Sequence, residues 1–213
     1  MKYKAVLFDF DGVIAETMPY HVKAWQQAFA AYGIQIRADD IYFQEGQIAN
    51  KIAHILAQKK GLYLDESELD QIIKNKRAIY KNTTKAQVYP ATKKIVSQLK
   101  QMSIKLGLVT GSILPNMVVV TGEAFLKNFE VIVTGDSVTN NKPHPEPYLT
   151  AARKLNVEPN ECVVIENAPL GIQAAKRAGM FCIAVKTTIK DEQILKEADL
   201  IVEDVSKIPV ENI

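Results

Sequence analysis

The sequence predicts an α/β protein with a parallel sheet at its core and a small helical domain inserted after the first strand. Three observations support this: short apolar runs recur along the chain, helical patterns separate the later runs, and a helical block interrupts this alternation near the start. Strands that alternate with helices form βαβ units, which build parallel sheets covered on both faces. The chain of 213 residues suits one medium domain that carries an insert.

Six short apolar runs predict the strands of the sheet. The first, Lys4–Phe10, contains the apolar residues Ala5-Val6-Leu7-Phe8 and ends at Asp9-Phe10-Asp11-Gly12, where the glycine indicates a turn. The other runs lie at 105–109, 130–133, 161–165, 181–185 and 200–202. Apolar residues spaced three and four apart predict helices at 91–102, 114–126, 146–155, 170–178 and 191–198.

Residues 16–85 break the alternation because they are almost entirely helical in pattern. A stripe of apolar residues from Met18 to Tyr32 follows a candidate N-cap at Thr17, and two further stripes run through 48–56 and 69–80. We therefore divide the chain into a core domain, residues 1–15 and 86–213, and a separate small helical domain, residues 16–85. The expected hinges lie near 16–17 and 85–89.

Composition and charge exclude several classes of function. Lys and Arg number 26 against 24 Asp and Glu, and no concentrated basic face is evident, so nucleic acid is not expected as a partner. The two cysteines lack metal-type spacing and are expected to be buried thiols. No apolar stretch is long enough for a membrane span or a signal-peptide core. We expect a cytoplasmic monomer or weak homodimer without a membrane partner.

Polar residues follow several of the predicted strands. Asp9 and Asp11 follow the first strand, residues 110–112 (Thr-Gly-Ser) follow the second, and residues 166–167 (Glu-Asn) follow the fourth. Lys142 lies between the third strand and the next helix. Each group alone could be a turn or a helix cap. Because ligands of open α/β sheets bind beyond the carboxyl ends of the strands, their convergence predicts a functional site.

These residue types suit phosphoryl transfer. One carboxylate can attack phosphorus as a covalent nucleophile, and a second acid two residues along the strand can protonate the leaving oxygen and then activate water. A hydroxyl at a helix N-terminus suits a phosphoryl oxygen, and a lysine offsets the concentrated negative charge. Mg²⁺ prefers a few protein oxygens together with phosphate and water.

The same segments resemble the four motifs of the haloacid dehalogenase superfamily of phosphatases. The matching segments are Asp9–Val13, Val109–Gly111, Lys142–Tyr148 and Val164–Asn167, the last continued by 171–180. The resemblance covers nearly the whole chain and implies a Rossmann-like core whose cap domain is inserted after Asp11. Tyr20-His21 and Ala24-Trp25 are similar to the β-phosphoglucomutase-like branch of that superfamily.

The resemblance implies a role for each motif residue. Asp9 becomes the nucleophile that forms an aspartyl-phosphate, and Asp11 becomes the general acid and base. Thr110 holds the phosphoryl group, and Lys142 neutralises charge. The implied cofactor is Mg²⁺, and the implied metal ligands are the Asp9 carboxylate, the Asp11 backbone carbonyl and the side chains of Glu166 and Asn167.

Further positions are expected to contact the substrate. Gly111 and Ser112 follow the second strand, and Gly46 could permit close approach in a cap turn. His21 is either a structural histidine or a substrate contact near Asp11. Lys76 lies on the apolar face of its helix, where it either extends past the stripe to solvent or points into the cleft between cap and core.

Two departures from the family pattern bear on function. The fourth motif usually offers an acidic pair, but its second member here is Asn167, whose amide oxygen can still coordinate a hard cation with one less negative charge. The β-phosphoglucomutases place an arginine shortly after the cap glycine, and they follow the second-motif hydroxyl with lysine and asparagine. Here Gly46 precedes Gln-Ile-Ala-Asn, and Ser112 precedes Ile-Leu. A mutase needs a distal cationic grip, so these losses favour a hydrolase.

We therefore expect Mg²⁺-dependent hydrolysis of a small phosphorylated metabolite, most simply a sugar phosphate. Three alternatives stay open: a phosphosugar mutase, a non-catalytic protein that binds a phosphorylated ligand, and a dehalogenase. Dehalogenases usually lack the second aspartate, so Asp11 favours phosphate chemistry over the last of these.

Overall fold

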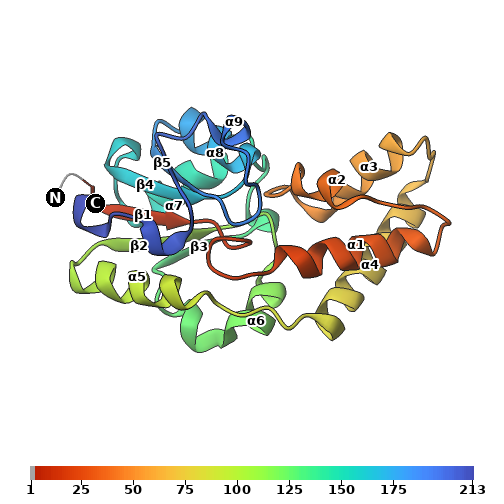
Figure 1. Ribbon diagram of the computed structural model, residues 1–213, viewed down its shortest axis with the longest axis horizontal. Helices are drawn as coiled ribbons and strands as arrows, with labels where there is room; N and C mark the ends of the chain where they lie inside the picture. The colour runs from red at the N-terminus through yellow and green to blue at the C-terminus, as the bar shows by residue number, and fades with distance from the viewer. Residues whose placement is uncertain (1–2) are drawn as a thin grey trace.

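The computed structural model describes residues 3–213, so the first two residues of the expected core domain lie outside the described part of the chain. A six-stranded sheet forms its centre, in the order β3-β2-β1-β4-β5-β6, and every neighbouring pair is parallel. Helices cover both faces of this sheet (Figure 1). The predicted α/β fold is confirmed.

All six predicted strands are present in the sheet. They are β1 (Ala5–Phe8), β2 (Lys105–Val109), β3 (Val131–Val133), β4 (Cys162–Glu166), β5 (Phe181–Val185) and β6 (Leu200–Val202). Strand β1 lies between β2 and β4, and all four of its residues are buried. A central parallel strand covered on both faces needs such a continuous apolar run.

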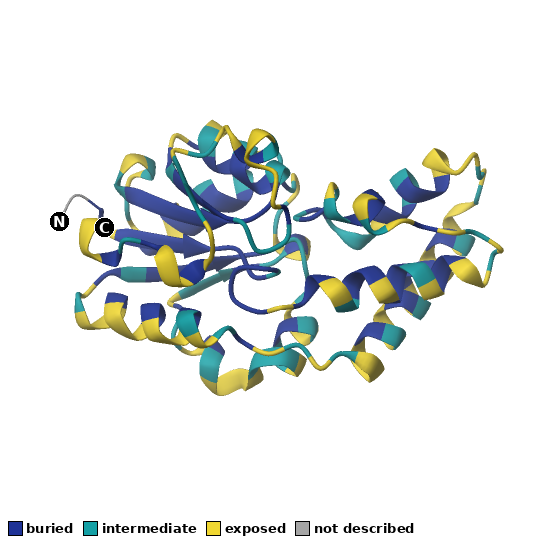
Figure 2. Cartoon of the chain, viewed as in Figure 1, coloured by how far each residue is buried: buried dark blue, intermediate teal, exposed yellow. Residues whose placement is uncertain are grey.

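Two helical layers sandwich the sheet. Val6 and Phe8 of β1 belong to one hydrophobic cluster and Ala5 and Leu7 to another, because alternate residues of a strand face opposite sides. Figure 2 shows the resulting contrast between buried strands and the exposed outer surfaces of the helices. The core helices are α5 (Pro90–Gln101), α6 (Leu114–Leu126), α7 (Glu146–Leu155), α8 (Pro169–Arg177) and α9 (Glu192–Leu195), and short 3-10 turns occupy Gly135–Ser137, Pro159–Glu161, Val205–Lys207 and Val210–Asn212.

Two core helices differ in detail from the sequence expectation. The helix expected at 191–198 shortens to the four residues of α9, where the Asp191 side chain accepts a hydrogen bond from the Gln193 amide. Helix α6 has the expected length, but Gly122 adopts a φ of 70° and kinks it. Glycine reaches this region without the steric cost that a side chain would add.

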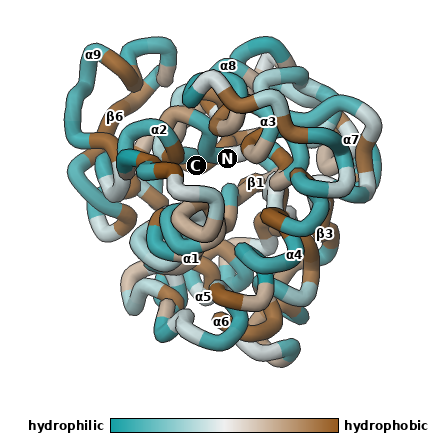
Figure 3. The backbone as a smooth tube through the Cα atoms, turned by 90° about the vertical axis from the view of Figure 1, so that its right-hand side faces the viewer, coloured by the Kyte–Doolittle hydropathy of each residue, from teal (hydrophilic) through white to brown (hydrophobic). Residues whose placement is uncertain are grey.

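The cap consists of four helices rather than the three stripes seen in the sequence. Their apolar faces form a third hydrophobic cluster with its own buried residues, among them Trp25, Leu56 and Ile72. Figure 3, which looks at the molecule from the cap end, shows hydrophilic and hydrophobic segments along these helices. The cap helices are α1 (Met18–Ala30), α2 (Ala38–Tyr42), α3 (Ala49–Lys59) and α4 (Glu66–Thr83).

The chain passes between core and cap through two segments that lie side by side. Ala15 and Val88 form an antiparallel bridge, the Glu16 amide donates to the Gln87 carbonyl at 3.1 Å, and the Tyr89 amide donates to the Ile14 carbonyl at 3.0 Å. These segments coincide with the expected hinges. The division at residues 15 and 85 stays a prediction, which the separate apolar cluster of the cap supports.

Within residues 3–213, no helix is both long enough and apolar enough to span a membrane.

Candidate active site

The predicted site residues meet at the carboxyl ends of the central strands. Asp9 directly follows β1, Thr110 follows β2, and Glu166 is the last residue of β4. Phe8 pairs with Leu108 on one side and with Ile165 on the other, so the strands end at about the same level. The structure thus brings together residues that lie far apart in the sequence.

Lys142 ties two of these strand ends together. Its Nζ donates to Asp9 Oδ1 at 2.6 Å, to Glu166 Oε1 at 2.7 Å and to the Val109 carbonyl at 3.1 Å. These three bonds use all its hydrogens in an environment that leaves the side chain 1% exposed. Burial lowers the pKa of Lys142, but the charges of Asp9 and Glu166 outweigh it and hold the pKa above its ordinary value. Lys142 therefore keeps its positive charge beside Asp9.

Glu166 has both carboxylate oxygens occupied. Its Oε1 accepts from Lys142 and from the Tyr148 hydroxyl at 2.8 Å, and its Oε2 accepts from the backbone amides of Asn167 at 2.9 Å and Ala168 at 3.1 Å. In this arrangement Glu166 positions Lys142. Its expected contact with a metal stays a prediction, and a direct contact would share oxygens that already accept two hydrogen bonds each.

Asp9 is 2% exposed and is held through one oxygen only. Lys142 contacts Oδ1, and Oδ2 accepts no hydrogen bond from the described residues. Burial raises the pKa of Asp9 to about 8; Lys142 opposes this rise, while the charges of Glu166 and Asp11 add to it. One lysine therefore does not balance the acids around it, which suits a site that takes up a cation.

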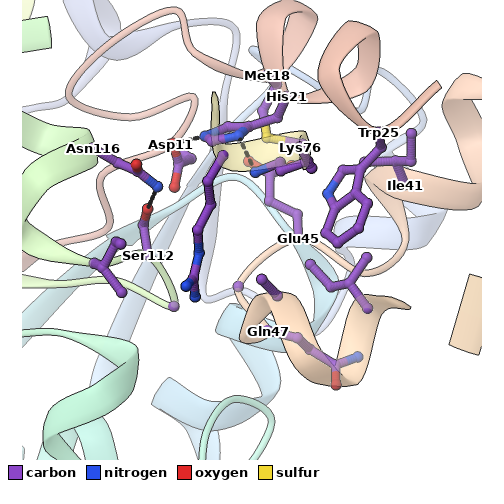
Figure 4. Close-up of a pocket in the computed structure, with 16 residues that line it drawn as sticks. Asp11, Met18, His21, Trp25, Ile41, Glu45, Gln47, Lys76, Ser112 and Asn116 are labelled. Carbon is purple, nitrogen blue, oxygen red and sulfur yellow. Dashed lines mark hydrogen bonds and ion pairs between the residues drawn. The ribbon is translucent and has the colours of Figure 1, made fainter. Parts of the chain in front are cut away.

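Asp11 anchors a chain of polar side chains that runs from core to cap. Asp11 Oδ1 accepts from the Thr17 hydroxyl at 2.6 Å and lies 3.0 Å from His21 Nε2, and His21 Nδ1 lies 2.9 Å from Lys76 Nζ. A lysine ammonium can only donate, so Nδ1 accepts and Nε2 carries the hydrogen that points at Asp11. Figure 4 shows Asp11, His21 and Lys76 along one side of the pocket.

The protonation states along this chain follow from burial and from the neighbouring charges. Burial raises the pKa of Asp11, but contacts with His21 and Thr17 outweigh it, so the pKa lies below its ordinary value. Burial and the Lys76 charge lower the pKa of His21. Burial also lowers the pKa of Lys76 to about 8. At neutral pH a neutral His21 therefore bridges an ionised Asp11 and a protonated Lys76.

Aromatic rings hold the cap end of this chain. The His21 ring stacks on Tyr80 with centroids 4.1 Å apart and an interplanar angle of 2°. Lys76 Nζ lies 5.2 Å from the Trp25 ring centroid and 5.4 Å from that of Tyr80, within cation–π range. Lys76 therefore faces the interior instead of extending to solvent.

Asn167 and Glu45 form a second link between core and cap. Asn167 Nδ2 donates to Glu45 Oε1 at 2.6 Å and to the Thr188 hydroxyl at 2.9 Å. Asn167 Oδ1 and Glu45 Oε2 are buried and have no hydrogen-bond partner. Glu45 was not predicted as a site residue from the sequence, because its contact with Asn167 depends on how the cap lies on the core.

These features test whether the residues suit Mg²⁺. An unpartnered amide oxygen at Asn167, a carboxylate oxygen of Asp9 without a hydrogen bond and an excess of acidic over basic groups fit a hard cation. No group of three or more His, Cys, Asp or Glu side chains in residues 3–213 is arranged so that it could hold a metal ion by itself.

Glycines allow the cap to approach the predicted site residues closely. A Cβ on Gly111 would lie 2.4 Å from the Gly46 carbonyl oxygen, and a Cβ on Gly46 would lie 3.0 Å from Lys142 Cδ. Gly46 also has a φ of +91°, which disfavours any side chain. The loop before α3 therefore rests directly on the core at the site.

A pocket of about 590 Å³, counted with its mouth, lies between cap and core. Five predicted substrate positions line it, whereas Arg77, Glu45 and Asn116 were not predicted from the sequence. Asn116 Nδ2 donates to Ser112 Oγ at 2.9 Å, as Figure 4 shows. The predicted lining residues are His21, Gly46, Lys76, Gly111 and Ser112.

Two aspartates, Asp9 and Asp11, follow the first strand of a parallel sheet, and Lys142 donates a hydrogen bond to Asp9. The cap lies over both aspartates. This arrangement is typical of a hydrolase of the phosphatase type. Comparison with protein families agrees: residues 6–185 match the model of the haloacid dehalogenase-like hydrolases. The chain belongs to that family. It is a hydrolase that acts on phosphoric monoesters.

Known relatives include both phosphatases and mutases. The chain is 33% identical to validoxylamine A 7'-phosphate phosphatase of Streptomyces hygroscopicus subsp. limoneus, over 97% of this chain and 96% of that protein. It is 32% identical to β-phosphoglucomutase of Bacillus subtilis, over 98% and 92% of the two chains. The crystal structure of β-phosphoglucomutase from Clostridium difficile superposes with a TM-score of 0.85 at 28% identity and covers 99% of this chain and 95% of that one.

Proposed function

We propose that this protein hydrolyses a small sugar phosphate with Mg²⁺ through an aspartyl-phosphate on Asp9. The observation that carries the proposal is the pairing of two differently held carboxylates. Asp9 is bound by Lys142 through one oxygen, and Asp11 is bound by Thr17 and His21 at the mouth of the pocket. Different environments for two nearby acids assign them different roles in catalysis.

Asp9 carries the first half-reaction. Its Oδ2 attacks the phosphorus of the ester, and a bond forms between Oδ2 and phosphorus as the bond to the ester oxygen breaks. The leaving oxygen takes a proton from Asp11, which must gain that proton when the ester binds, because the hydrogen bonds from Thr17 and His21 leave it ionised in the free site. Thr110 Oγ1 already accepts from the Ser112 amide at 2.9 Å, so its hydrogen is available to donate to a phosphoryl oxygen.

Asp11 carries the second half-reaction. Water attacks the phosphorus of the aspartyl-phosphate, Asp11 takes the proton of that water, and the bond between phosphorus and Oδ2 breaks. Inorganic phosphate leaves and the Asp9 carboxylate is restored. The hydrogen bonds from Thr17 and His21 keep Asp11 ionised, which is the state that this step requires.

The residues that would hold Mg²⁺ are the Asp9 carboxylate, the Asp11 backbone carbonyl and Asn167 Oδ1. When bound, the cation offsets the repulsion between the Asp9 carboxylate and the phosphate. Lys142 adds a fixed positive charge from the opposite oxygen of Asp9. Glu166 and Tyr148 hold that lysine in place.

The pocket suggests the class of leaving group. Its cap wall contributes apolar surface from Met18, Trp25 and Ile52, and its core wall contributes the polar side chains of Ser112 and Asn116. Sugars present apolar C–H faces together with hydroxyl groups, so such a mixed lining suits them. The relative named as a phosphatase of a phosphorylated validoxylamine supports a cyclic polyol or sugar ester.

Phosphate release tests the proposal. The full chain is assayed with a panel of sugar phosphates and with an aryl phosphate, each in Mg²⁺ and in chelator. We expect release that requires Mg²⁺ and that favours sugar phosphates. Folded protein that releases no phosphate from any ester in ample Mg²⁺ would contradict it.

One observation favours the mutase alternative. Arg77 lines the pocket and has no ion-pair or hydrogen-bond partner among residues 3–213, so a cation is available for a second anionic group. The positions where β-phosphoglucomutases carry their arginine and lysine are apolar or neutral here. Formation of an isomeric sugar phosphate without phosphate release would select the mutase, and tight binding without either product would select a non-catalytic role.

A further inference from the structure

Glu45 is a buried acid that the proposed reaction does not use. It lies on the cap between α2 and α3, directly before Gly46, and it is 4% exposed. The only described hydrogen bond of its side chain joins Oε1 to Asn167 Nδ2 at 2.6 Å. No lysine, arginine or histidine in residues 3–213 forms an ion pair with it. Figure 4 shows Glu45 among the cap residues around the pocket.

The contact fixes which end of the Asn167 amide is available. Asn167 Nδ2 has two hydrogens, and both are used, one by Glu45 and one by Thr188. Glu45 Oε1 accepts this hydrogen bond, so rotating the amide by half a turn would place Oδ1 against Oε1 and lose the bond, whereas the Thr188 hydroxyl could donate to Oδ1 instead of accepting. Oδ1 therefore stays unpartnered in a fully buried residue. The oxygen is the end of the amide that binds a hard cation.

The identity of residue 167 makes this contact possible. An aspartate at this position would place a second carboxylate beside Glu45, where two like charges at hydrogen-bond distance repel. Asparagine attracts the same acid instead. The acidic group that the fourth motif usually carries on the core is thus carried on the cap in this chain, where burial and the charges of Asp9, Asp11 and Glu166 raise the pKa of Glu45 well above its ordinary value.

The contact also depends on the position of the cap. Glu45 precedes Gly46, whose carbonyl oxygen packs against Gly111 and whose α-carbon faces the Lys142 side chain. Asn167 lies on the core, after β4. Opening of the cap at its two hinge segments would separate Glu45 from Asn167 and release the amide.

We propose that Glu45 is a positioning residue that orients Asn167 Oδ1 toward the cation, so that tight Mg²⁺ binding requires the closed cap. This inference rests on the proposed Mg²⁺-dependent function. It places the control of cation affinity on a cap residue whose side chain acts through its hydrogen bond to Asn167.

Cation binding by the full chain tests this without catalysis. Binding of Mn²⁺ is followed by the loss of the free-ion electron paramagnetic resonance signal, and Mg²⁺ is then titrated in competition. Glu45→Ala is expected to weaken Mg²⁺ binding about 10- to 100-fold, as loss of a partner that orients a metal ligand does. Glu45→Gln keeps a carbonyl oxygen that accepts from Asn167, so its affinity should stay within about threefold of the wild type. Circular dichroism confirms that each variant is folded.

A double-mutant cycle separates orientation from charge. Asn167→Asp alone should not tighten Mg²⁺ binding, because Glu45 repels the new carboxylate. Asn167→Asp combined with Glu45→Gln should tighten it, because the Gln amide can donate to the aspartate. Asp70→Asn is the matched control: it removes one acid from an exposed position on the cap helix α4, and it should not change the affinity.

The outcomes are distinct. Unchanged affinity in Glu45→Ala, equal losses in Glu45→Ala and Glu45→Gln, or tighter binding by Asn167→Asp alone would each overturn the positioning role. If the wild type releases phosphate while one of these results holds, only this inference fails. If the wild type neither binds Mg²⁺ nor releases phosphate, the proposed function fails with it.

Discussion

Replacing Asp9 by Asn should abolish turnover and at the same time stabilise the metal-free protein. Asn has nearly the shape of Asp, and its carbonyl oxygen can still accept from Lys142, so the packing of the site is kept. The substitution removes the nucleophilic carboxylate and one negative charge from a buried cluster. Function and stability should therefore move in opposite directions, as occurs where an active site holds unfavourable charge.

The size of the effect follows from the Asp9 carboxyl. Burial raises the pKa of Asp9 from 3.8 to about 8. The Lys142 charge lowers this pKa, whereas the charges of Glu166 and Asp11 raise it further. Between these two values the folded protein holds the proton more tightly than the unfolded chain, so the stability of the wild type falls as pH rises through this window. Each pH unit is worth up to about 1.4 kcal/mol, so the gap between the variant and the wild type should grow by about 2–4 kcal/mol from pH 5 to pH 8.

Urea unfolding in chelator, followed by circular dichroism at pH 5 and pH 8, measures this gap. Asp70→Asn makes the same change of charge on the exposed face of α4 and should stay within about 0.5 kcal/mol of the wild type at both pH values. Mg²⁺ should then stabilise the wild type more than the variant, because the variant has lost a metal ligand. An Asp9→Asn protein that is less stable than the wild type at pH 8, or a gap that does not grow with pH, would refute the excess of negative charge at the site.

Three further predictions concern neighbouring residues. Tyr148→Phe removes a hydroxyl that donates to the buried Glu166, and should lower the free energy of unfolding by about 1–2 kcal/mol in urea titrations, with the ring packing unchanged. Arg77→Ala should raise the KM for esters with a second anionic group about 10-fold and leave that for an aryl phosphate unchanged, which steady-state assays of phosphate release compare directly. The hydrogen bond from Lys59 holds the pKa of Asp40 below its ordinary value of 3.8, so this pair stabilises the cap above that pH and the stabilisation is lost as pH falls. Asp40→Asn should therefore cost about 1–3 kcal/mol at pH 7 and less at pH 3, measured by thermal unfolding at both pH values.

The sheet and the convergence of polar residues at its carboxyl end could be predicted because their signals are local. Ala5–Phe8 is an unbroken apolar run that stops at an Asp-x-Asp-Gly turn, and parallel strands bring such stops to one edge. The same reasoning places Thr110 and Glu166 beside Asp9. Helix α2 escaped prediction because its five residues are too few for a 3.6-residue period to show.

The contacts between cap and core could not be predicted because no local pattern encodes them. Glu45 and Asn167 are separated by 122 positions in the chain. Taken alone, Glu45 would be interpreted as an acid in a loop and Asn167 as part of a helix cap. Their pairing depends on the angle between two apolar clusters that pack separately. Lys76 shows the same limit: its helical stripe was evident, but its place over Trp25 and beside His21 required the fold.

Two cap residues, Lys76 and Glu45, add contacts to the polar residues that follow the strands of the core. Lys76 reaches Asp11 through His21, and Glu45 reaches Asn167 directly. Each link ends on a core residue for which we propose a role in catalysis or metal binding, and each would break if the cap opened. A phosphate ester that holds the cap closed therefore completes the proton-transfer group and the cation site together.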